Sequence, residues 1–235
     1  MQSANRRSAV YVDGYNLYYG RLRHTAFKWL DVVTLFTNIL KTQDPTASVD
    51  LVHYFSAPAL ARFATHGQVS MESQQAYHRA LKILHPAEFA LTLGSHSFER
   101  NGTLLPKVLP GRGYDRAQRA RVWHLEEKQT DVNLAMAMYR DVCKGKYQQV
   151  VICSNDSDVE PVLRAIREDF AETQIGVITP VPPADDGRQP RNLSTSLSQW
   201  ADWTRRHIVD DELSTAQLPL KIPTNKRPIL KPGHW

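Results

Sequence analysis

The residues with the clearest chemical potential are aspartates that lie next to apolar segments. They are Asp13, Asp131, Asp156 and Asp158. Two negative charges 4 Å apart near a protein surface repel by about 4 kcal/mol, so four gathered carboxylates require a cation. Carboxylate ligands without His or Cys favour Mg²⁺ or Mn²⁺, and such an ion can activate water for attack on a phosphodiester. If these aspartates meet, the chemistry they predict is metal-dependent phosphodiester hydrolysis.

The segments beside these aspartates are typical of an α/β fold. Val150–Cys153 is an unbroken apolar run, as expected for a strand buried on both faces of a parallel sheet. Strands are predicted at 9–12, 50–56, 89–93, 150–153 and 174–179, and helices at 31–41, 72–85, 131–145, 159–166 and 194–206. The alternation of strands and helices predicts a mostly parallel central sheet of about five strands with helices on both faces.

Such a sheet would bring the aspartates together if the first and fourth strands are neighbours. Asp13 follows the first strand and Asp156 the fourth, and ligands of open α/β sheets bind beyond the carboxyl ends of the strands. Structural alternatives exist for each residue. Asp156 and Asp158 are also typical of turns and helix caps, and Asp131 in a first helical turn also complements the helix dipole.

Further polar and aromatic residues near the aspartates are candidates for contacts with substrate. They are Tyr15, Asn16, Lys128, Ser154 and Asn155. Hydroxyl, amide and ammonium groups suit phosphate or metal-bound water, and tyrosines can stack on nucleic-acid bases. Local turns, a solvated lysine and packing against the first helix are the alternative explanations.

A basic, irregular insertion at about 97–129 separates the third strand from the helix that Asp131 opens. The chain has 29 Lys and Arg against 24 Asp and Glu, and its net charge is +5. Gly and Pro interrupt the insertion, so a long loop or irregular hairpin is predicted there. Arg112 and Arg121 are its candidates for contact with a phosphate backbone, although a run of charges is often only a solvated face.

Composition predicts a protein of the cytoplasm with one main domain. The length of 235 residues suits a domain at 8–207 followed by an extension at 208–235, whose prolines and lysines predict an extended segment. The sequence has no apolar run near the roughly 18 residues of a membrane span, and two cysteines provide no disulfide framework. No membrane partner is therefore expected, and assembly into a homo-oligomer stays open.

Three short motifs resemble those of the NYN domain, a PIN-like nuclease group that includes bacterial proteins of the LabA type. The motifs are VDGYN at 12–16, KQTDV at 128–132 and SNDSD at 154–158. The resemblance implies a Rossmann-like fold in which Asp13, Asp131, Asp156 and Asp158 hold metal and Asn16 is their polar neighbour. It also implies RNA cleavage that depends on a divalent metal, with products carrying 5′-phosphate and 3′-hydroxyl ends.

The function expected from sequence is therefore that of an endoribonuclease, or a broader nuclease, with Mg²⁺ or Mn²⁺ as cofactor and RNA as partner. Two alternatives stay open. The domain could bind RNA as a regulatory module with little turnover, because the basic insertion and tyrosines suit binding equally well. The acidic pocket could also act on a small phosphorylated or aromatic molecule.

Overall fold

Six parallel strands form the central sheet, in the order β10-β9-β8-β1-β2-β3. The strands are β1 (Arg6–Asp13), β2 (Ala47–Ser56), β3 (Phe89–Leu93), β8 (Gln149–Cys153), β9 (Gln174–Ile178) and β10 (Trp203–Arg205). The computed structural model describes residues 6–184 and 194–235. The predicted α/β class is confirmed, as is the neighbouring position of β1 and β8, the first and fourth predicted strands.

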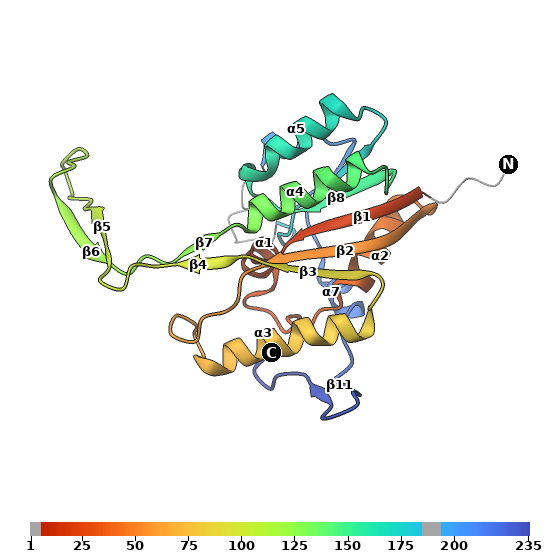
Figure 1. The fold of residues 1–235 in the computed structure, drawn as a ribbon, viewed down its shortest axis with the longest axis horizontal. Coiled ribbons are helices and arrows are strands. Elements are labelled where there is room, and N and C mark those ends of the chain that lie inside the picture. The colour runs from red at the N-terminus through yellow and green to blue at the C-terminus, as the bar shows by residue number, and fades with distance from the viewer. Residues whose placement is uncertain (1–5, 185–193) are drawn as a thin grey trace.

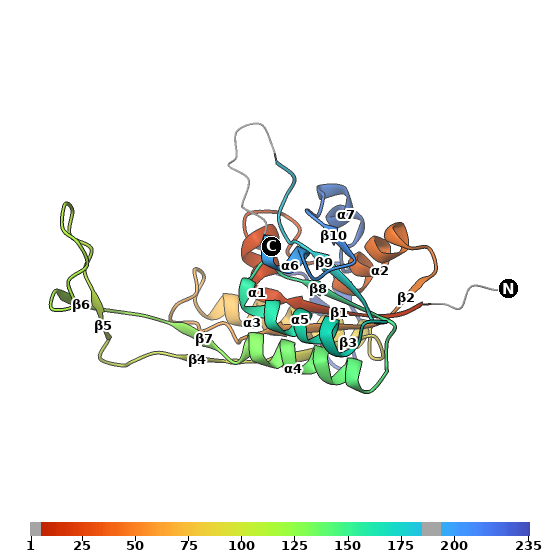
Figure 2. The ribbon, with the colours of Figure 1, turned by 90° about the horizontal axis from the view of Figure 1, so that it is seen from above.

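Helices cover both faces of this sheet (Figures 1 and 2). The helical elements are α1 (Gly14–Leu17), the π-helix η1 (Tyr18–Leu22), α2 (Val32–Gln43), α3 (Gln68–Leu84), α4 (Thr130–Cys143), the 3-10 turn η2 (Ser157–Val159), α5 (Glu160–Asp169), α6 (Thr195–Ser198) and α7 (Asp210–Thr215). Figure 1 shows α4 and α5 on one face and α2, α3 and α7 on the other. Across the two described ranges, no helix combines the length and apolar character needed to cross a membrane.

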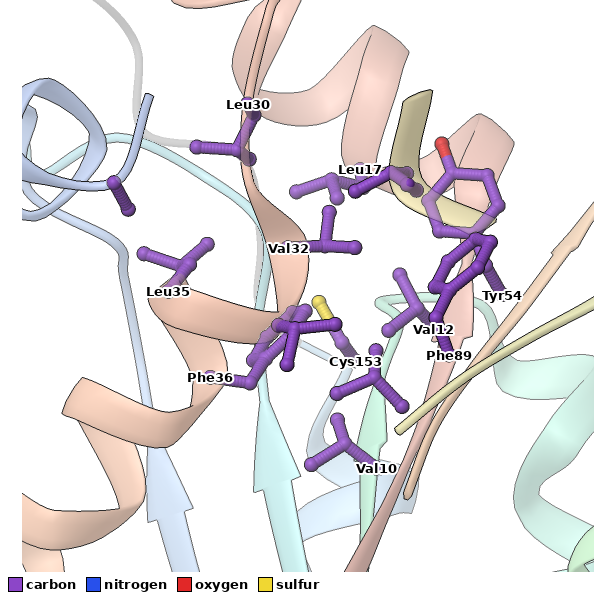
Figure 3. Packing of buried hydrophobic residues seen from close by; sticks show 14 of the residues in the cluster. Val10, Val12, Leu17, Leu30, Val32, Leu35, Phe36, Tyr54, Phe89 and Cys153 are labelled. Atoms are coloured by element: carbon purple, nitrogen blue, oxygen red, sulfur yellow. The ribbon is translucent and has the colours of Figure 1, made fainter. Parts of the chain in front are cut away.

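Alternating side chains of β1 supply both halves of the core. Val10 and Val12 point toward α2, where Figure 3 shows them packed with Phe36. Ala9 and Tyr11 point to the opposite face, which α4 and α5 cover. Successive side chains of a strand point to opposite faces, so a strand flanked by helices on both sides must be apolar throughout. This explains the continuous apolar runs at 9–12 within β1 and at 150–153 within β8.

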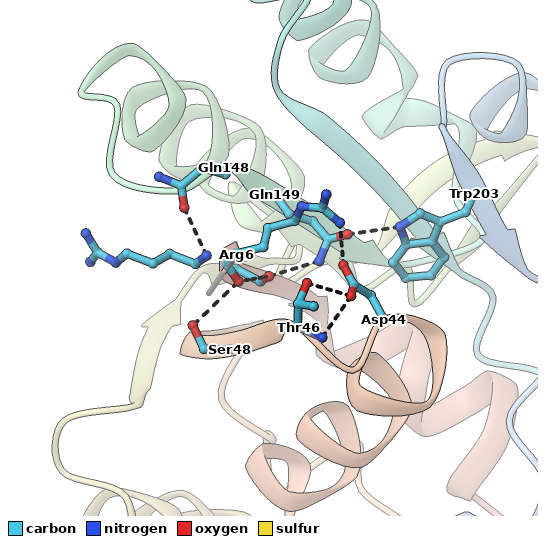
Figure 4. A network of polar contacts seen from close by, with 9 residues as sticks. Arg6, Asp44, Thr46, Ser48, Gln148, Gln149 and Trp203 are labelled. Atoms are coloured by element: carbon cyan, nitrogen blue, oxygen red, sulfur yellow. Dashed lines mark hydrogen bonds and ion pairs between the residues drawn. The ribbon is translucent and has the colours of Figure 1, made fainter. Parts of the chain in front are cut away.

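The sixth strand, β10, corrects the predicted helix at 194–206. Only α6 (Thr195–Ser198) is helical there, and Trp203 begins an edge strand paired with β9. The Trp203 ring packs over Gly176, where an added Cβ would lie 2.2 Å from it. The Trp203 indole also donates to Gln149 Oε1 at 3.0 Å, within the polar network that Figure 4 shows around Arg6 and Asp44.

Residues of the predicted basic insertion form a long two-stranded arm that projects from the sheet (Figure 1). The strands of its base are β4 (Ser95–Ser97) and β7 (Glu126–Lys128), and those of its outer part are β5 (Thr103–Pro106) and β6 (Arg119–Val122). Both pairs are antiparallel. The irregular hairpin predicted at 97–129 is therefore an ordered arm.

The extension at 208–235 was predicted to be extended, and this is wrong. It contains α7 and a hairpin of β11 (Lys221–Ile222) and β12 (Ile229–Leu230), and its residues Leu213, Leu218 and Ile229 are buried in the core. Trp235 packs on Trp29, and the centroids of the two rings lie 6.1 Å apart. Apolar residues before and between the prolines therefore hold this segment on the domain.

Candidate active site at the carboxyl edge of the sheet

Asp13 is the last residue of β1 and is held rigidly at the carboxyl edge of the sheet. Only 3% of it is exposed. Its Oδ1 accepts from the backbone N–H of Asn16 at 2.9 Å, and its Oδ2 accepts from Asn16 Nδ2 at 2.7 Å. Gly14 follows because the chain passes against β2, where an added Cβ would lie 2.6 Å from the carbonyl oxygen of Phe55. The predicted partnership of Asp13 and Asn16 is present in the structure.

The loop after β8 comes to Asp13 because the two strands are paired. Ser154 Oγ donates to Asp13 Oδ2 at 3.0 Å and accepts from the backbone N–H of Asp156 at 3.1 Å. The backbone N–H of Asn155 donates to Asn16 Oδ1 at 3.3 Å. This short network joins the VDGYN and SNDSD motifs, although their residues lie some 140 positions apart in the sequence.

Asp156 also has a capping role, which is the structural alternative to a chemical one. Its Oδ1 accepts from the backbone N–H of Asp158 at 3.0 Å and caps η2. A cap uses one oxygen of the carboxylate, so the other stays available for a ligand. Asp158 lies in the first turn of η2 and is exposed.

Asp131 lies in the first turn of α4, as predicted. Thr130 is the first residue of this helix, and Gln129 precedes it with a left-handed φ of 76°. Gly94 lets the end of α4 approach β3 closely, because a Cβ there would lie 2.5 Å from Thr130 Oγ1. The close approach places the first turn of α4, which contains Asp131, beside the chain that follows β3.

Glu127 is a fifth carboxylate of this site, and sequence reasoning missed it. It lies on β7 at the base of the arm and is half-buried. Its Oε1 is buried without a hydrogen-bond partner among the described residues. The only signal in the sequence was its position within the four residues before Asp131, in an insertion that was interpreted as a basic loop.

The acidic residues interact electrostatically, and their pKa values show it. Burial and then the charges of Asp13 and Asp156 raise the pKa of Asp131 to about 6. Burial raises the pKa of Asp13 against the opposing hydrogen bonds from Asn16 and Ser154. Burial and the charge of Asp13 raise the pKa of Glu127. Perturbed carboxylates gathered at one edge of a sheet are typical of a functional site.

The donor set suits a hard divalent cation, while the side chains do not form a closed cage. In the described ranges, no three His, Cys, Asp or Glu side chains are placed to hold a metal ion together. Both oxygens of Asp13 accept hydrogen bonds. Mg²⁺ commonly binds through one or two carboxylates, several waters and the substrate phosphates, so an all-protein cage is not required. The Oε1 atom of Glu127, buried without a hydrogen-bond partner among the described residues, is a further candidate oxygen ligand for the cation.

The remaining predicted contact residues separate into a near group and a distant group. Tyr15 is near, and burial and the charge of Glu127 raise its pKa. Lys128 is at the base of the arm and forms an ion pair of 2.5 Å with Glu126. Arg112 and Arg121 lie on the projecting part of the arm, and Arg121 donates to the carbonyl oxygens of Asn101 and Gly102 at 3.1 Å. The structure does not bring these two arginines to the acids.

A family comparison agrees with this architecture. Residues 7–197, which contain all four predicted aspartates, match the family model of the NYN domain. The chain belongs to the NYN domain family. This confirms the resemblance drawn from the three motifs and relates the fold to the PIN-like nuclease superfamily.

Two individual proteins are similar to this NYN domain protein. It is 35% identical over 251 residues to 6-hydroxy-3-succinoylpyridine 3-monooxygenase HspA of Pseudomonas putida (strain DSM 28022 / S16), a match that covers 100% of this chain and 77% of HspA. The crystal structure of VPA0982 from Vibrio parahaemolyticus RIMD 2210633, a protein of unknown function, has a TM-score of 0.51 and 19% identity. The structural match covers 90% of this chain and 98% of the VPA0982 chain, and it supports the fold alone.

Proposed function

We propose that this NYN domain protein is a metal-dependent endoribonuclease. The observation that carries the proposal is the group of acidic residues at the carboxyl edge of the sheet, where burial and mutual repulsion raise the pKa of Asp131 to about 6. A site that holds carboxylates against their own repulsion is suited to a bound cation. Membership of the PIN-like nuclease superfamily supports the same chemistry.

Mg²⁺ or Mn²⁺ would be held by Asp13, Glu127, Asp131, Asp156 and Asp158, directly or through water. When bound, the ion supplies an activated water and neutralises charge on the phosphate oxygens. The protein itself orients the carboxylates. Asn16 and Ser154 fix both oxygens of Asp13, and Ser154 also holds the loop that carries Asp156.

The basic arm supports a polymeric substrate. Its segment 99–123 contains six basic residues and two acidic ones, so it carries a charge of +4 out of +5 for the whole chain. A positive arm beside an acidic centre attracts a polyanion and leaves the cleavage site to the metal. A small phosphorylated substrate would gain nothing from an arm that projects beyond the site.

Cleavage of end-labelled single-stranded RNA and DNA, with EDTA, Mg²⁺ or Mn²⁺, tests this proposal. Asp13→Asn and Asp156→Asn should each abolish metal-dependent cleavage, while Glu168→Gln, at an exposed site on α5, should leave it unchanged. RNA retention without any cleavage would favour the binding module instead. Cleavage that persists in both Asn variants would overturn the assignment of the acidic site.

A second candidate function is monooxygenation of a substituted pyridine, because HspA, named as 6-hydroxy-3-succinoylpyridine 3-monooxygenase, is 35% identical over the whole of this chain. A monooxygenase inserts one atom of O₂ into its substrate and reduces the other atom to water with two electrons and two protons. Oxygen uptake with 6-hydroxy-3-succinoylpyridine and a nicotinamide or flavin reductant would test it. Substrate-dependent uptake with no RNA cleavage would decide for this function.

A further inference from the structure

Three side chains spaced four residues apart form a stacked ladder that leads away from the acidic site. The Tyr15 and Tyr19 rings are stacked, with centroids 5.7 Å apart and planes at 29°. The Arg23 guanidinium lies 5.3 Å from the centroid of the Tyr19 ring. Aromatic rings and guanidinium groups are planar, and both stack on nucleobases.

The helix that carries this ladder has an unusual geometry. Tyr18–Leu22 is a π-helix, in which the backbone N–H of Arg23 donates to Tyr18 O at 2.8 Å. Such turns are rare and frequently occur at functional sites. The inner side of the turn is anchored, because buried Arg21 donates to Ile208 O at 2.7 Å and forms an ion pair with Asp210. The outer side carries Tyr19 and Arg23, both exposed.

The inner end of the ladder belongs to the acidic site. Tyr15 Oη lies 3.2 Å from His96 Nε2. His96 lies opposite Glu127 in the register of the antiparallel strands β4 and β7. The outer end borders a cavity of about 630 Å³ whose lining includes Tyr19, Arg23 and Phe27. Among the described residues, the ladder thus connects the candidate cleavage site with a cavity whose volume suits a nucleotide.

Arg23 is an exposed cation in the part of the chain that the structure describes. Within residues 6–184 and 194–235 it forms no ion pair with a carboxylate. An exposed guanidinium that lies on an aromatic ring keeps its charge and most of its N–H donors for an incoming anion. A nucleotide offers both a flat base and a phosphate to such a group.

We propose that Arg23, whose guanidinium lies on the Tyr19 ring, forms with its outer face a stacking platform for an unpaired nucleobase of single-stranded RNA whose backbone continues to the acidic site. This inference rests on the proposed function and names its substrate class. A base within a duplex is covered on both faces and cannot stack on the platform. The platform therefore selects single-stranded RNA over duplex RNA.

Binding without cleavage tests the platform directly. Fluorescence anisotropy would be measured in EDTA with a labelled single-stranded 12-mer RNA, its duplex and uridine monophosphate as competitor. Arg23→Lys keeps the charge but removes the plane, so single-strand affinity should fall about fivefold or more, as for loss of one stacked base. Arg79→Gln, at an exposed site on α3, should have no effect.

A second measurement identifies the contact itself. Ultraviolet cross-linking of RNA that carries 5-iodouridine should modify the segment 19–23, and Arg23→Lys should reduce the yield. Unchanged affinity in Arg23→Lys together with cross-links elsewhere would overturn the platform. Equal affinity for duplex, or uridine monophosphate bound as tightly as the 12-mer, would also overturn it, the second by assigning the site to a free nucleotide.

The two proposals fail separately. If cleavage requires Asp156 but the Arg23→Lys variant binds and cuts as the parent does, the nuclease assignment stands and the platform is wrong. If single-strand binding depends on Arg23 but no metal supports cleavage, the platform stands and the nuclease assignment is wrong.

Discussion

Ser154 Oγ donates a hydrogen bond of 3.0 Å to Asp13 Oδ2 and so links the ends of the two central strands. The same hydroxyl accepts from the backbone N–H of Asp156 at 3.1 Å. Ser154 is fully buried. One side chain thus fixes the relative positions of two acidic residues that lie far apart in the sequence.

Replacement of Ser154 should impair activity through the position of the acids. Ser154→Ala removes both hydrogen bonds, and a supporting residue of this kind commonly changes activity or metal affinity about 10-fold to 100-fold. The cleavage rate should be measured against Mg²⁺ concentration, where a raised half-saturation would indicate misplaced ligands. Ser157→Ala, at an exposed site on η2, is the matched control. Equal rates for both variants would refute the positioning role.

Asp131→Asn should stabilise the metal-free protein, increasingly as pH rises. The folded-state pKa of Asp131 is raised from 3.8 to about 6, so the folded state favours the protonated carboxyl. Ionisation of Asp131 therefore lowers the free energy of unfolding. This penalty is absent below pH 4, grows between pH 4 and 6, and is complete above pH 6. After allowance for solvent screening at a half-buried site we expect about 1 kcal/mol, or 2–4 °C in Tm.

Thermal unfolding in EDTA at pH 5 and pH 8 checks this expectation. The gain from Asp131→Asn should be larger at pH 8 than at pH 5, and Mg²⁺ should raise the Tm of the parent protein more than that of the variant. Asp211→Asn, an exposed site on α7, is the control. A gain that is equal at both pH values would contradict a raised pKa.

Gly176→Ala should destabilise the edge of the sheet. The added Cβ would lie 2.2 Å from the Trp203 ring, and overpacking of this kind commonly costs about 1–3 kcal/mol. Urea unfolding of both single variants and of Gly176→Ala with Trp203→Leu would measure the coupling. The cost of the alanine should shrink in the Trp203→Leu background, and a constant cost would show that the two residues do not interact.

Arginines of the arm should contribute to RNA affinity through charge alone. Arg112 and Arg116 are exposed, and replacing both by Gln should weaken binding similarly for all sequences. The slope of log affinity against log salt should fall by about 1–2, because each phosphate contact releases counterions. Anisotropy at several salt concentrations measures this slope. A slope equal to that of Arg79→Gln would exclude the two arginines from the RNA contact.

Much of this fold follows from local patterns. Apolar runs at 9–12 and 150–153, each followed by an aspartate, predicted β1 and β8 and the acids at their ends. These features were predictable because a strand buried on both faces must be apolar throughout, and the chain leaves the sheet at a fixed edge.

Local patterns could not predict three features: the role of Glu127, the sixth strand and the packed C-terminal segment. Glu127 is a site residue only because β7 pairs with β4, and Trp203 is in a strand only because Gly176 leaves room for its ring. The C-terminal segment buries few apolar residues, such as Leu218 and Ile229, and their spacing matches neither a helix nor a strand. In each case the deciding partner lies elsewhere in the chain.

The sequence by itself determined the fold class and four acidic residues, since both depend on the types and spacing of neighbouring residues. The tertiary structure alone decided how the acids are oriented, where the arm begins and what its base adds to the site. Those features depend on strand pairing and on close contacts between distant segments. Local propensity does not encode such contacts, because they form only when the whole sheet is assembled.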